Sequence, residues 1–178
     1  MKQVQKLVRA IAKSRNRYLN LISALSEEQA QHKLESNVWN AIEITEHLFW
    51  AEQGALFGMW KTLYAHRNGQ LSVLKAIHEG LSIEEEVART WQPKEIMPAV
   101  APPRMGGTLI FGSVSLQGFQ FTLKSLGSEL SDDDLLILAH PHPISGVLDF
   151  RQRLEFIRFH IDRHYDQVKK LIAVNNVN

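Results

Sequence analysis

Apolar residues recur at intervals of three and four along several long stretches of the chain, which places them on one face of an α-helix. The first stripe lies within residues 4–25, the second within residues 44–63 and the last within residues 154–171. A further long helix is expected from about residue 113 to residue 130, with two glycines inside it. Such stripes can bury one another, so the pattern predicts an all-α fold.

Residues with capping side chains set the expected helix boundaries. Either Asn37 or Asn40 can cap the second long helix, which is predicted to run to about Arg67, before an Asn-Gly pair. Asp149, followed three residues later by glutamine, is the expected N-cap of the last helix, which should end near Ala173. The capping residues therefore agree with the apolar stripes.

The connections between the long helices are expected to be long. Capping boxes at residues 26–29 and 82–85 predict short helices within them. Residues 91–107 hold four of the six prolines and are expected to form an ordered loop, as are residues 140–146. No stretch alternates convincingly as a strand would. The pattern therefore predicts an up-and-down four-helix bundle with long connections.

Length and charge limit the number of domains, the classes of partner and the cellular compartment that we expect. The 178 residues suit a single domain over residues 1–178, with a frayed tail at residues 172–178. Lys and Arg number 20 against 19 Asp and Glu, which argues against a nucleic-acid partner and against a polybasic membrane anchor. The sequence shows no membrane span and no signal-peptide pattern. With no cysteine present, these features favour the cytoplasm.

Three histidines fall within the apolar stripes. His47 lies in the stripe of the second long helix, and His160 and His164 continue the stripe of the last one. Their four-residue spacing places His160 and His164 on one helix face, about one turn apart. Buried imidazoles must satisfy two ring nitrogens each without water, and a shared metal ion would satisfy one nitrogen of every ring. The sequence therefore predicts a metal site made by these three residues.

The ligand set bears on the chemistry of the site. Three histidines leave a coordination position open, as in catalytic metal sites, whereas structural zinc usually has four protein ligands. We expect one divalent ion, nickel or zinc first, with iron, manganese or copper as alternatives, because histidine ligation alone does not select among such metals. The absence of cysteine excludes thiolate metal ligands and a cysteine nucleophile.

Five segments together resemble one known family. They are WNAIEITEHLFWAE (39–52), IEEEVARTWQP (83–93), APPRM (101–105), HPISGVLDFRQRLEF (142–156) and FHIDRHYDQV (159–168). The early E-H-L and the late H-x-x-R-H-x-x-Q form a specific pair in this order. On these motifs the chain resembles the DinB/YfiT-like superfamily, in particular its branch with a late HPxxG-containing loop. The resemblance spans nearly the whole chain.

The resemblance implies a four-helix bundle whose central cleft holds a nickel, zinc or similar ion on three histidines. By motif position these are again His47, His160 and His164. Relatives with known activity include thiol-dependent S-transferases and a thiol-dependent isomerase, and many others are described as metal-dependent hydrolases. The resemblance also implies a homodimer. The family name derives from DNA-damage induction and does not imply DNA binding.

Polar residues near these motifs have alternative interpretations. Glu43, one turn before His47, either orients a ligand imidazole or is a solvated helix charge, and for Glu46 the solvated charge is favoured. Arg163 could anchor an anionic substrate group, although a surface ion pair with a neighbouring aspartate is favoured. His142 could lie beside the cleft, but turn chemistry also explains its segment.

Three functional hypotheses follow. The first is an enzyme whose metal activates a water or a small thiol for attack on a small electrophile, giving hydrolysis or S-transfer. The second is a non-catalytic module that binds a small molecule through the metal, for example in a stress response. The third is a structural bundle with polar core histidines, for which added metal would not raise the melting temperature. The sequence favours the first and does not identify the substrate.

Overall fold

A computed structural model describes residues 1–70, 74–91 and 101–175 of the chain. Within these ranges the chain is mostly helical and includes one β-hairpin. The elements, in chain order, are α1 Gln3–Ser23, α2 Glu27–Gln31, α3 Ala41–Arg67, α4 Ile83–Thr90, α5 Leu109–Glu129, α6 Asp134–Ile137, β1 Ala139–His142, β2 Gly146–Asp149 and α7 Phe150–Asn175. The predicted predominance of helix is confirmed.

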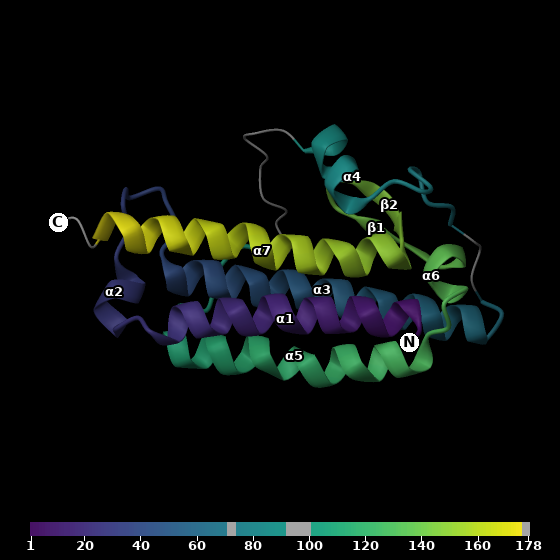
Figure 1. The fold of residues 1–178 in the computed structure, drawn as a ribbon, viewed down its shortest axis with the longest axis horizontal. Coiled ribbons are helices and arrows are strands. Elements are labelled where there is room, and N and C mark those ends of the chain that lie inside the picture. Colours follow the sequence, from purple (N-terminus) through teal and green to yellow (C-terminus); the bar gives the residue numbers. More distant parts are fainter. Residues whose placement is uncertain (71–73, 92–100, 176–178) are drawn as a thin grey trace.

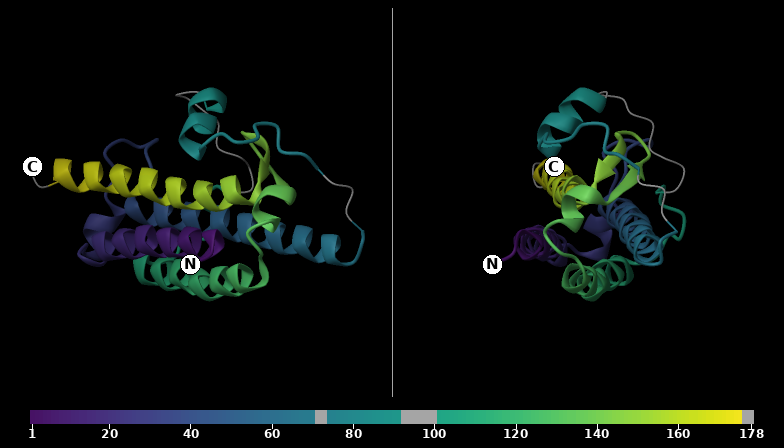
Figure 2. Two further views of the ribbon diagram at one scale, coloured as in Figure 1. Left: turned by 45° about the vertical axis from the view of Figure 1, so that its right-hand side comes forward. Right: turned by 90° about the vertical axis from the view of Figure 1, so that its right-hand side faces the viewer.

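The long helices α1, α3, α5 and α7 lie side by side around the main hydrophobic core (Figure 1). Helix α1 packs against α7 and α5, and α3 packs against the same two helices. The end-on view in Figure 2 shows these four helices around a common axis, with α4 and the hairpin outside them. Strand β1 contacts both α3 and α7, so the hairpin covers the line along which those two helices meet.

The directions of the long helices differ from a strict up-and-down order. Helices α3 and α5 start at the same end, where Thr45 lies beside Gly112, and finish at the same end, where Arg67 donates to Glu129 Oε2 at 2.7 Å. They therefore run parallel, and Figure 1 shows α1 and α7 both running in the opposite direction. The connection from α3 to α5 returns the chain along the molecule, as in bundles with a long crossover. The expected alternation of neighbouring helices is corrected accordingly.

Capping residues explain where two of the long helices begin. Asn40, not Asn37, caps α3: its side chain accepts from the Glu43 N–H at 2.9 Å, and the Glu43 carboxylate accepts from the Asn40 N–H at 2.9 Å. Helix α5 begins earlier than residue 113, at Leu109, because Thr108 is its N-cap and accepts a first-turn backbone N–H at 3.2 Å.

The remaining caps follow the sequence closely. Both predicted capping boxes are present, at the starts of α2 and α4. Before α7, Asp149 Oδ1 accepts from the Gln152 N–H at 2.7 Å, and Gln152 Oε1 accepts from the Asp149 N–H at 3.1 Å. Helix α7 continues to Asn175, so part of the tail predicted to fray is helical. Residues 176–178 lie outside the described residues.

Residues 139–149 form a two-stranded antiparallel hairpin where a loop was expected. The strands pair from Ala139 with Asp149 to His142 with Gly146, and Gly146 has a φ of +73°. Prolines within and just after β1 hid this strand from the sequence pattern, because proline cannot donate to a ladder and is confined to sheet edges. In a hairpin both strands are edges, so these prolines are tolerated.

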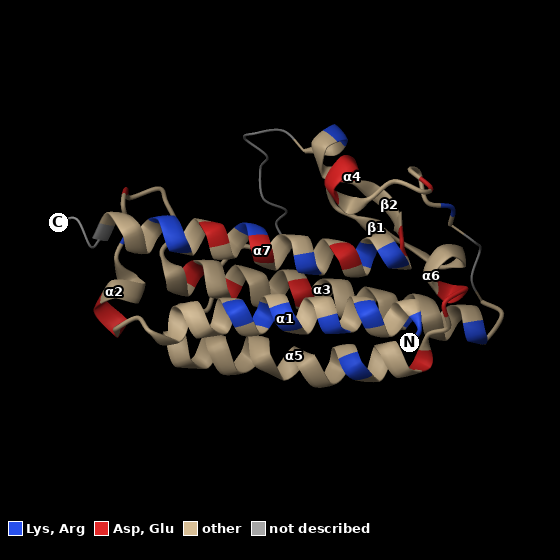
Figure 3. Cartoon of the chain, in the orientation of Figure 1, with Lys and Arg blue, Asp and Glu red and all other residues tan. Residues whose placement is uncertain are grey.

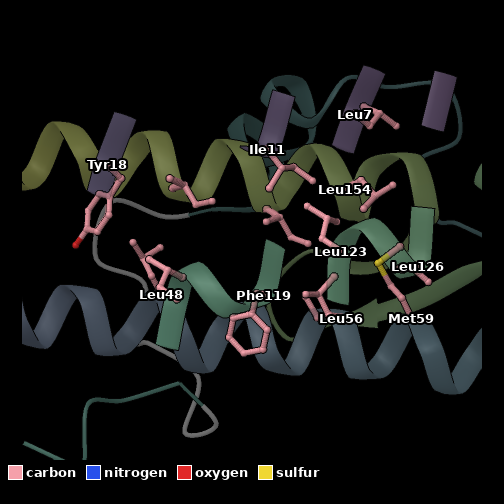
Figure 4. Packing of buried hydrophobic residues seen from close by; sticks show 14 of the residues in the cluster. Leu7, Ile11, Tyr18, Leu48, Leu56, Met59, Phe119, Leu123, Leu126 and Leu154 are labelled. Atoms are coloured by element: carbon pink, nitrogen blue, oxygen red, sulfur yellow. The ribbon is translucent and has the colours of Figure 1, made fainter. Parts of the chain in front are cut away.

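The core between the long helices is largely aliphatic, and Figure 4 shows how its side chains interdigitate. Tyr18 is fully buried within it, and its hydroxyl lies 2.8 Å from Thr45 Oγ1. A buried ion pair joins Arg15 of α1 to Glu52 of α3, and Arg15 also donates to Gln120 Oε1 of α5 at 2.6 Å. Burial raises the pKa of Glu52 to about 7, and the Arg15 charge limits the rise.

The outer surface differs from helix to helix. In Figure 3, α1 carries mainly basic residues and α7 carries both signs of charge. Helix α5 exposes the apolar residues Ile110, Phe111, Val114 and Phe121. None of the helices in the described ranges combines the length and the apolar character needed to cross a membrane.

Candidate metal centre

His47, His160 and His164 meet where α3 packs against α7. His160 Nε2 lies 3.0 Å from His47 Nε2 and 3.0 Å from His164 Nε2. All three residues are buried, and one ring nitrogen from each lies within 4.8 Å of the others. The four-residue spacing on α7 places two rings on one face, and the third faces them from α3. The structure thus brings together the three histidines selected from the sequence.

Hydrogen bonds of the outer nitrogens orient two of these rings. His47 Nδ1 donates to the carbonyl oxygen of Ala101 at 2.8 Å, and His164 Nδ1 donates to Gln167 Oε1 at 2.8 Å. A neutral imidazole carries one proton, so the Nε2 atoms of His47 and His164 present lone pairs to the centre of the cluster. Partners of this kind hold metal-ligating histidines in their binding orientation.

The inner nitrogens cannot fully satisfy one another. If His160 Nε2 carries the proton of its ring, it can donate it to Nε2 of only one of the two neighbouring rings. The Nε2 lone pair of the other ring then lies 3.0 Å from His160 Nε2 without receiving a proton from it. Nitrogens bound at ~2.0–2.1 Å to one ion, at angles of ~90–110°, lie about 2.9–3.4 Å apart. The two 3.0 Å separations match this range. These three residues could therefore hold one divalent ion through their ring nitrogens.

Burial keeps the three imidazoles neutral. It lowers the pKa of His47, lowers that of His160 well below its usual value and lowers that of His164 to about 3. The positive charge of Arg163 contributes to the lowering of all three pKa values. Neutral imidazole is the form that binds metal ions. At neutral pH no proton has to leave these rings before a metal binds.

We expect the metal-free protein to lose stability as the pH falls below about 6.5. A histidine whose folded pKa is depressed binds more protons when unfolded, so the free energy of unfolding falls from about pH 6.5 toward the folded pKa, about 3 for His164. Urea unfolding of wild-type and His164→Gln proteins at a series of pH values measures this. The wild type should lose stability more steeply, and equal slopes would contradict the prediction.

Glu46 holds the segment that carries Ala101 against α3. Its carboxylate accepts from the backbone N–H groups of residues 104–106 at 2.5, 2.7 and 3.2 Å and from Trp50 Nε1 at 3.0 Å. Burial alone would raise the pKa of Glu46, but these donors bring it below its usual value. The residue is 4% exposed, so its interpretation as a solvated helix charge is wrong.

We expect Glu46→Gln to weaken metal binding by about 10–100-fold, the usual cost of disturbing groups that orient metal ligands. The NH2 of the glutamine amide cannot accept hydrogen bonds from the backbone N–H groups of residues 104–106. The segment from Ala101 to residue 106 would therefore loosen, and His47 would lose its acceptor on Ala101. Competition titration against a zinc chelator measures the affinity. Glu43→Gln, one turn earlier, is the matched control, because glutamine also completes a capping box. An equal loss in both variants would contradict the prediction.

Glu43 lies at the start of α3 and serves its cap. Its carboxylate accepts from the Asn40 N–H and from Lys33 Nζ, the latter at 2.7 Å. In the described part of the chain, the groups that orient the imidazoles are the carbonyl of Ala101 and the side chain of Gln167. The alternative that Glu43 orients a ligand imidazole is therefore corrected. The position of Gln167, three residues after His164, was a readable signal, because residues at that spacing share a helix face.

Arg163 lies outside the cavity that adjoins the cluster. It is exposed, and its guanidinium carbon lies 5.1 Å from the centroid of the Trp91 ring. The expected ion pair with a neighbouring aspartate is not found within the described ranges, where Asp162 pairs with Arg17 at 2.8 Å. A guanidinium over an indole is a cation–π contact, which the sequence did not indicate.

A cavity of about 430 Å³ adjoins the cluster between α3, α7, β1 and residues 101–104. His47 and His160 form part of its wall, and most of the rest is apolar or aromatic. Trp50, one of the aromatic residues, carries the Arg104 guanidinium carbon 3.8 Å above its ring. A cavity of this size and lining suits a small organic molecule.

His142 lies at the end of β1 and lines the same cavity. Its Nδ1 accepts from the Ser145 N–H at 3.0 Å, so the proton of the neutral ring is on Nε2. The ring packs against Phe156, with centroids 4.2 Å apart. Burial and the charge of Arg153 lower the pKa of His142 to about 3. His142 is thus a neutral group beside the cluster and not a member of it.

The hairpin reaches α3 at a glycine. The His140 ring occupies the space that a Cβ at Gly58 would need, and His140 Nδ1 lies 3.1 Å from Thr62 Oγ1. Burial, together with the charges of Arg153 and Lys61, lowers the pKa of His140 to about 4. The ring is therefore neutral where it packs on the helix, and the hairpin closes one side of the cavity.

A protein-family model matches most of the chain. It is described as the DinB superfamily and covers residues 10–168, which include the three histidines of the cluster. Neither the comparison with curated proteins nor the comparison with solved structures finds a match. The family model confirms the resemblance carried by the sequence motifs. With well over half of its residues matched, the chain belongs to the DinB superfamily.

Proposed function

We propose that this protein is a metal-dependent enzyme that acts on a small molecule through one divalent ion held by His47, His160 and His164. The observation that carries the proposal is the convergence of three neutral imidazoles, at ligand spacing, beside a cavity. Nickel or zinc suits such a ligand set, with iron, manganese or copper as alternatives. We propose that the fold around this site is the four-helix bundle implied by the family.

A bound ion would act as a Lewis acid and lower the pKa of a water or thiol, so that a nucleophile is available near neutral pH. The residues of the chain position and shield the reaction. The imidazoles approach from α3 and α7, and the cavity beside His47 and His160 offers space for a small substrate. Trp50, Trp91 and Phe156 supply apolar walls that exclude water, which strengthens electrostatic interactions inside. His142, protonated on Nε2, supplies a neutral donor on the cavity wall.

The proposed reaction is attack on a small electrophile, either S-transfer from a low-molecular-weight thiol or hydrolysis. The absence of cysteine supports a thiol from outside the chain. The test is a screen of nickel-, zinc- and manganese-loaded protein with thiols and electrophiles, with His160→Ala as the comparator. Turnover that the variant lacks is expected. Equal background in both proteins, for every metal and thiol, would contradict an enzymatic role.

A non-catalytic, metal-dependent module that binds a small molecule is the second candidate. One observation favours it: with pKa values of about 4 and 3, His140 and His142 cannot exchange protons with a substrate as acid and base near neutral pH. Retention of a small molecule by the metal-loaded protein without turnover would distinguish this candidate from the enzyme.

We also propose a homodimer located in the cytoplasm, with no nucleic-acid partner. The exposed apolar residues Ile110, Val114 and Phe121 support the dimer, because their spacing forms a stripe along α5. The near balance of acidic and basic residues supports the absence of a nucleic-acid partner.

A further inference from the structure

Arg153 is a buried cation in the wall of the cavity. Its side chain is 4% exposed, and within the described ranges neither its Nε nor its Nη1 has a hydrogen-bond acceptor. Burial lowers its pKa only to about 10, so the guanidinium stays charged at neutral pH. Buried charges are normally paired, because removing an unpaired charge from water is costly. An arginine in this state indicates an anion that comes from outside the chain.

Within the described ranges no ion pair joins Arg153 to an acidic group of the chain. Glu52, which also lines the cavity, forms the buried ion pair with Arg15 through Oε1, and its Oε2 has no hydrogen-bond partner there. Asp149, just before α7, accepts a first-turn backbone N–H at 2.7 Å and lies 3.7 Å from Arg151. The positive charge of Arg153 is instead felt by two histidines of the cavity wall: it contributes to the lowered pKa values of His140 and His142 in β1.

Arg153 shares a helix face with the metal centre. It precedes His160 by seven residues, two turns of helix, which places the two side chains on one face about 10 Å apart along the axis. Phe156 and Ile157 occupy the turn between them, and all four residues line the cavity. Along α7 the cavity wall therefore presents a cation, an apolar floor and then the histidine cluster.

We propose that Arg153 binds the carboxylate of an organic acid whose apolar body lies on Phe156 and Ile157 and whose far end reaches the histidine cluster. This names the substrate class of the proposed function and rests on it. The planar guanidinium fork matches a carboxylate, and one positive charge balances one negative charge. A phosphate dianion would bring a second negative charge, and Arg104, the other arginine of the wall, is stacked on Trp50 with its guanidinium carbon 3.8 Å from the ring centroid.

The test is the binding of phenylacetate by the full chain, measured by calorimetry and by the shift in melting temperature. Phenylacetamide, which has the same body without the charge, and inorganic phosphate are the comparison ligands. We expect the affinity for phenylacetate to fall at least about tenfold in Arg153→Met, as loss of a charge-assisted hydrogen-bonded pair implies. Arg9→Met, an exposed arginine of α1, removes the same charge outside the cavity and should leave the affinity unchanged.

Three results would overturn the proposal. They are equal affinity in wild type and Arg153→Met, binding of phenylacetamide as tight as that of phenylacetate, and Arg153-dependent binding of phosphate that exceeds that of phenylacetate. If the Arg153→Met variant does not fold, Arg153→Lys provides the test. Lysine keeps the positive charge but lacks the planar pair of N–H donors, so this variant should still bind phenylacetate more weakly than the wild type.

Measurements on metal-stripped, desalted protein and on zinc-loaded protein separate this proposal from the metal site. Phenylacetate binding that depends on Arg153 in the stripped protein supports the proposal even if no metal binds. Binding that needs zinc and survives in Arg153→Met would place the carboxylate on the metal. That result would contradict the proposed role of Arg153 but would not contradict the proposed metal site.

Discussion

Replacement of His160 by alanine is expected to lower the affinity for the divalent ion by more than about 100-fold, because even the groups that merely orient ligands contribute 10–100-fold. His160 Nε2 lies 3.0 Å from both other inner nitrogens, so its removal leaves two ligands with no third nitrogen between them. Elemental analysis of the purified protein and calorimetric titration with zinc and nickel measure the loss.

The melting temperature gives an independent readout of the same change. Metal at 100 times its dissociation constant should stabilise the wild type by about 2.7 kcal/mol and the His160→Ala variant by far less. His66→Ala is the matched control, because His66 is an exposed histidine in the last turn of α3, whereas His47 lies near the start of that helix. A variant at position 160 that binds a full equivalent of metal with unchanged affinity would remove the basis for a three-histidine centre.

The second large effect is expected from the buried ion pair between Arg15 and Glu52. Glu52→Leu should lower the free energy of unfolding by about 3–5 kcal/mol, because it leaves a buried arginine without its anion. Arg15→Met should cost less, since the carboxyl group left behind can take up a proton, as its pKa of about 7 indicates. Urea unfolding at about pH 8, where the pair is ionised, compares the variants.

The double variant Arg15→Met/Glu52→Leu serves as the control for this prediction. Apolar side chains of similar volume can replace a buried ion pair with little loss, so the double variant should be close to the wild type. Gln120 would then lose its partner at 2.6 Å, which sets a small residual cost. A Glu52→Leu protein less than about 1 kcal/mol below the wild type would show that the pair is not buried as described.

The cluster of three histidines could be predicted from the sequence, because the signal for each of them is local and periodic. His47, His160 and His164 each lie within an apolar stripe, so the sequence alone places them on inward helix faces. Their convergence in space needs only that α3 packs against α7. Helix N-caps were readable for the same reason, as at Asn40, because a cap depends on residues three positions away.

Features that depend on distant segments were not readable. The burial of Glu46 depends on backbone N–H groups of residues 104–106, and backbone donors are the same for every residue type except proline. The acceptor for His47 is likewise a backbone carbonyl, that of Ala101. The parallel course of α3 and α5 depends on the path of their connection, which an apolar stripe does not encode. The hairpin was obscured by prolines that only an edge strand tolerates.

The contact between Gly58 and the His140 ring limits what position 58 of α3 can carry. A Cβ at this position would clash with the ring, so any residue other than glycine requires the ring to shift. Because the His140 ring lines the cavity, a substitution at position 58 would alter the shape of the cavity wall. It would do so eleven residues along α3 from His47, without replacing any member of the histidine cluster.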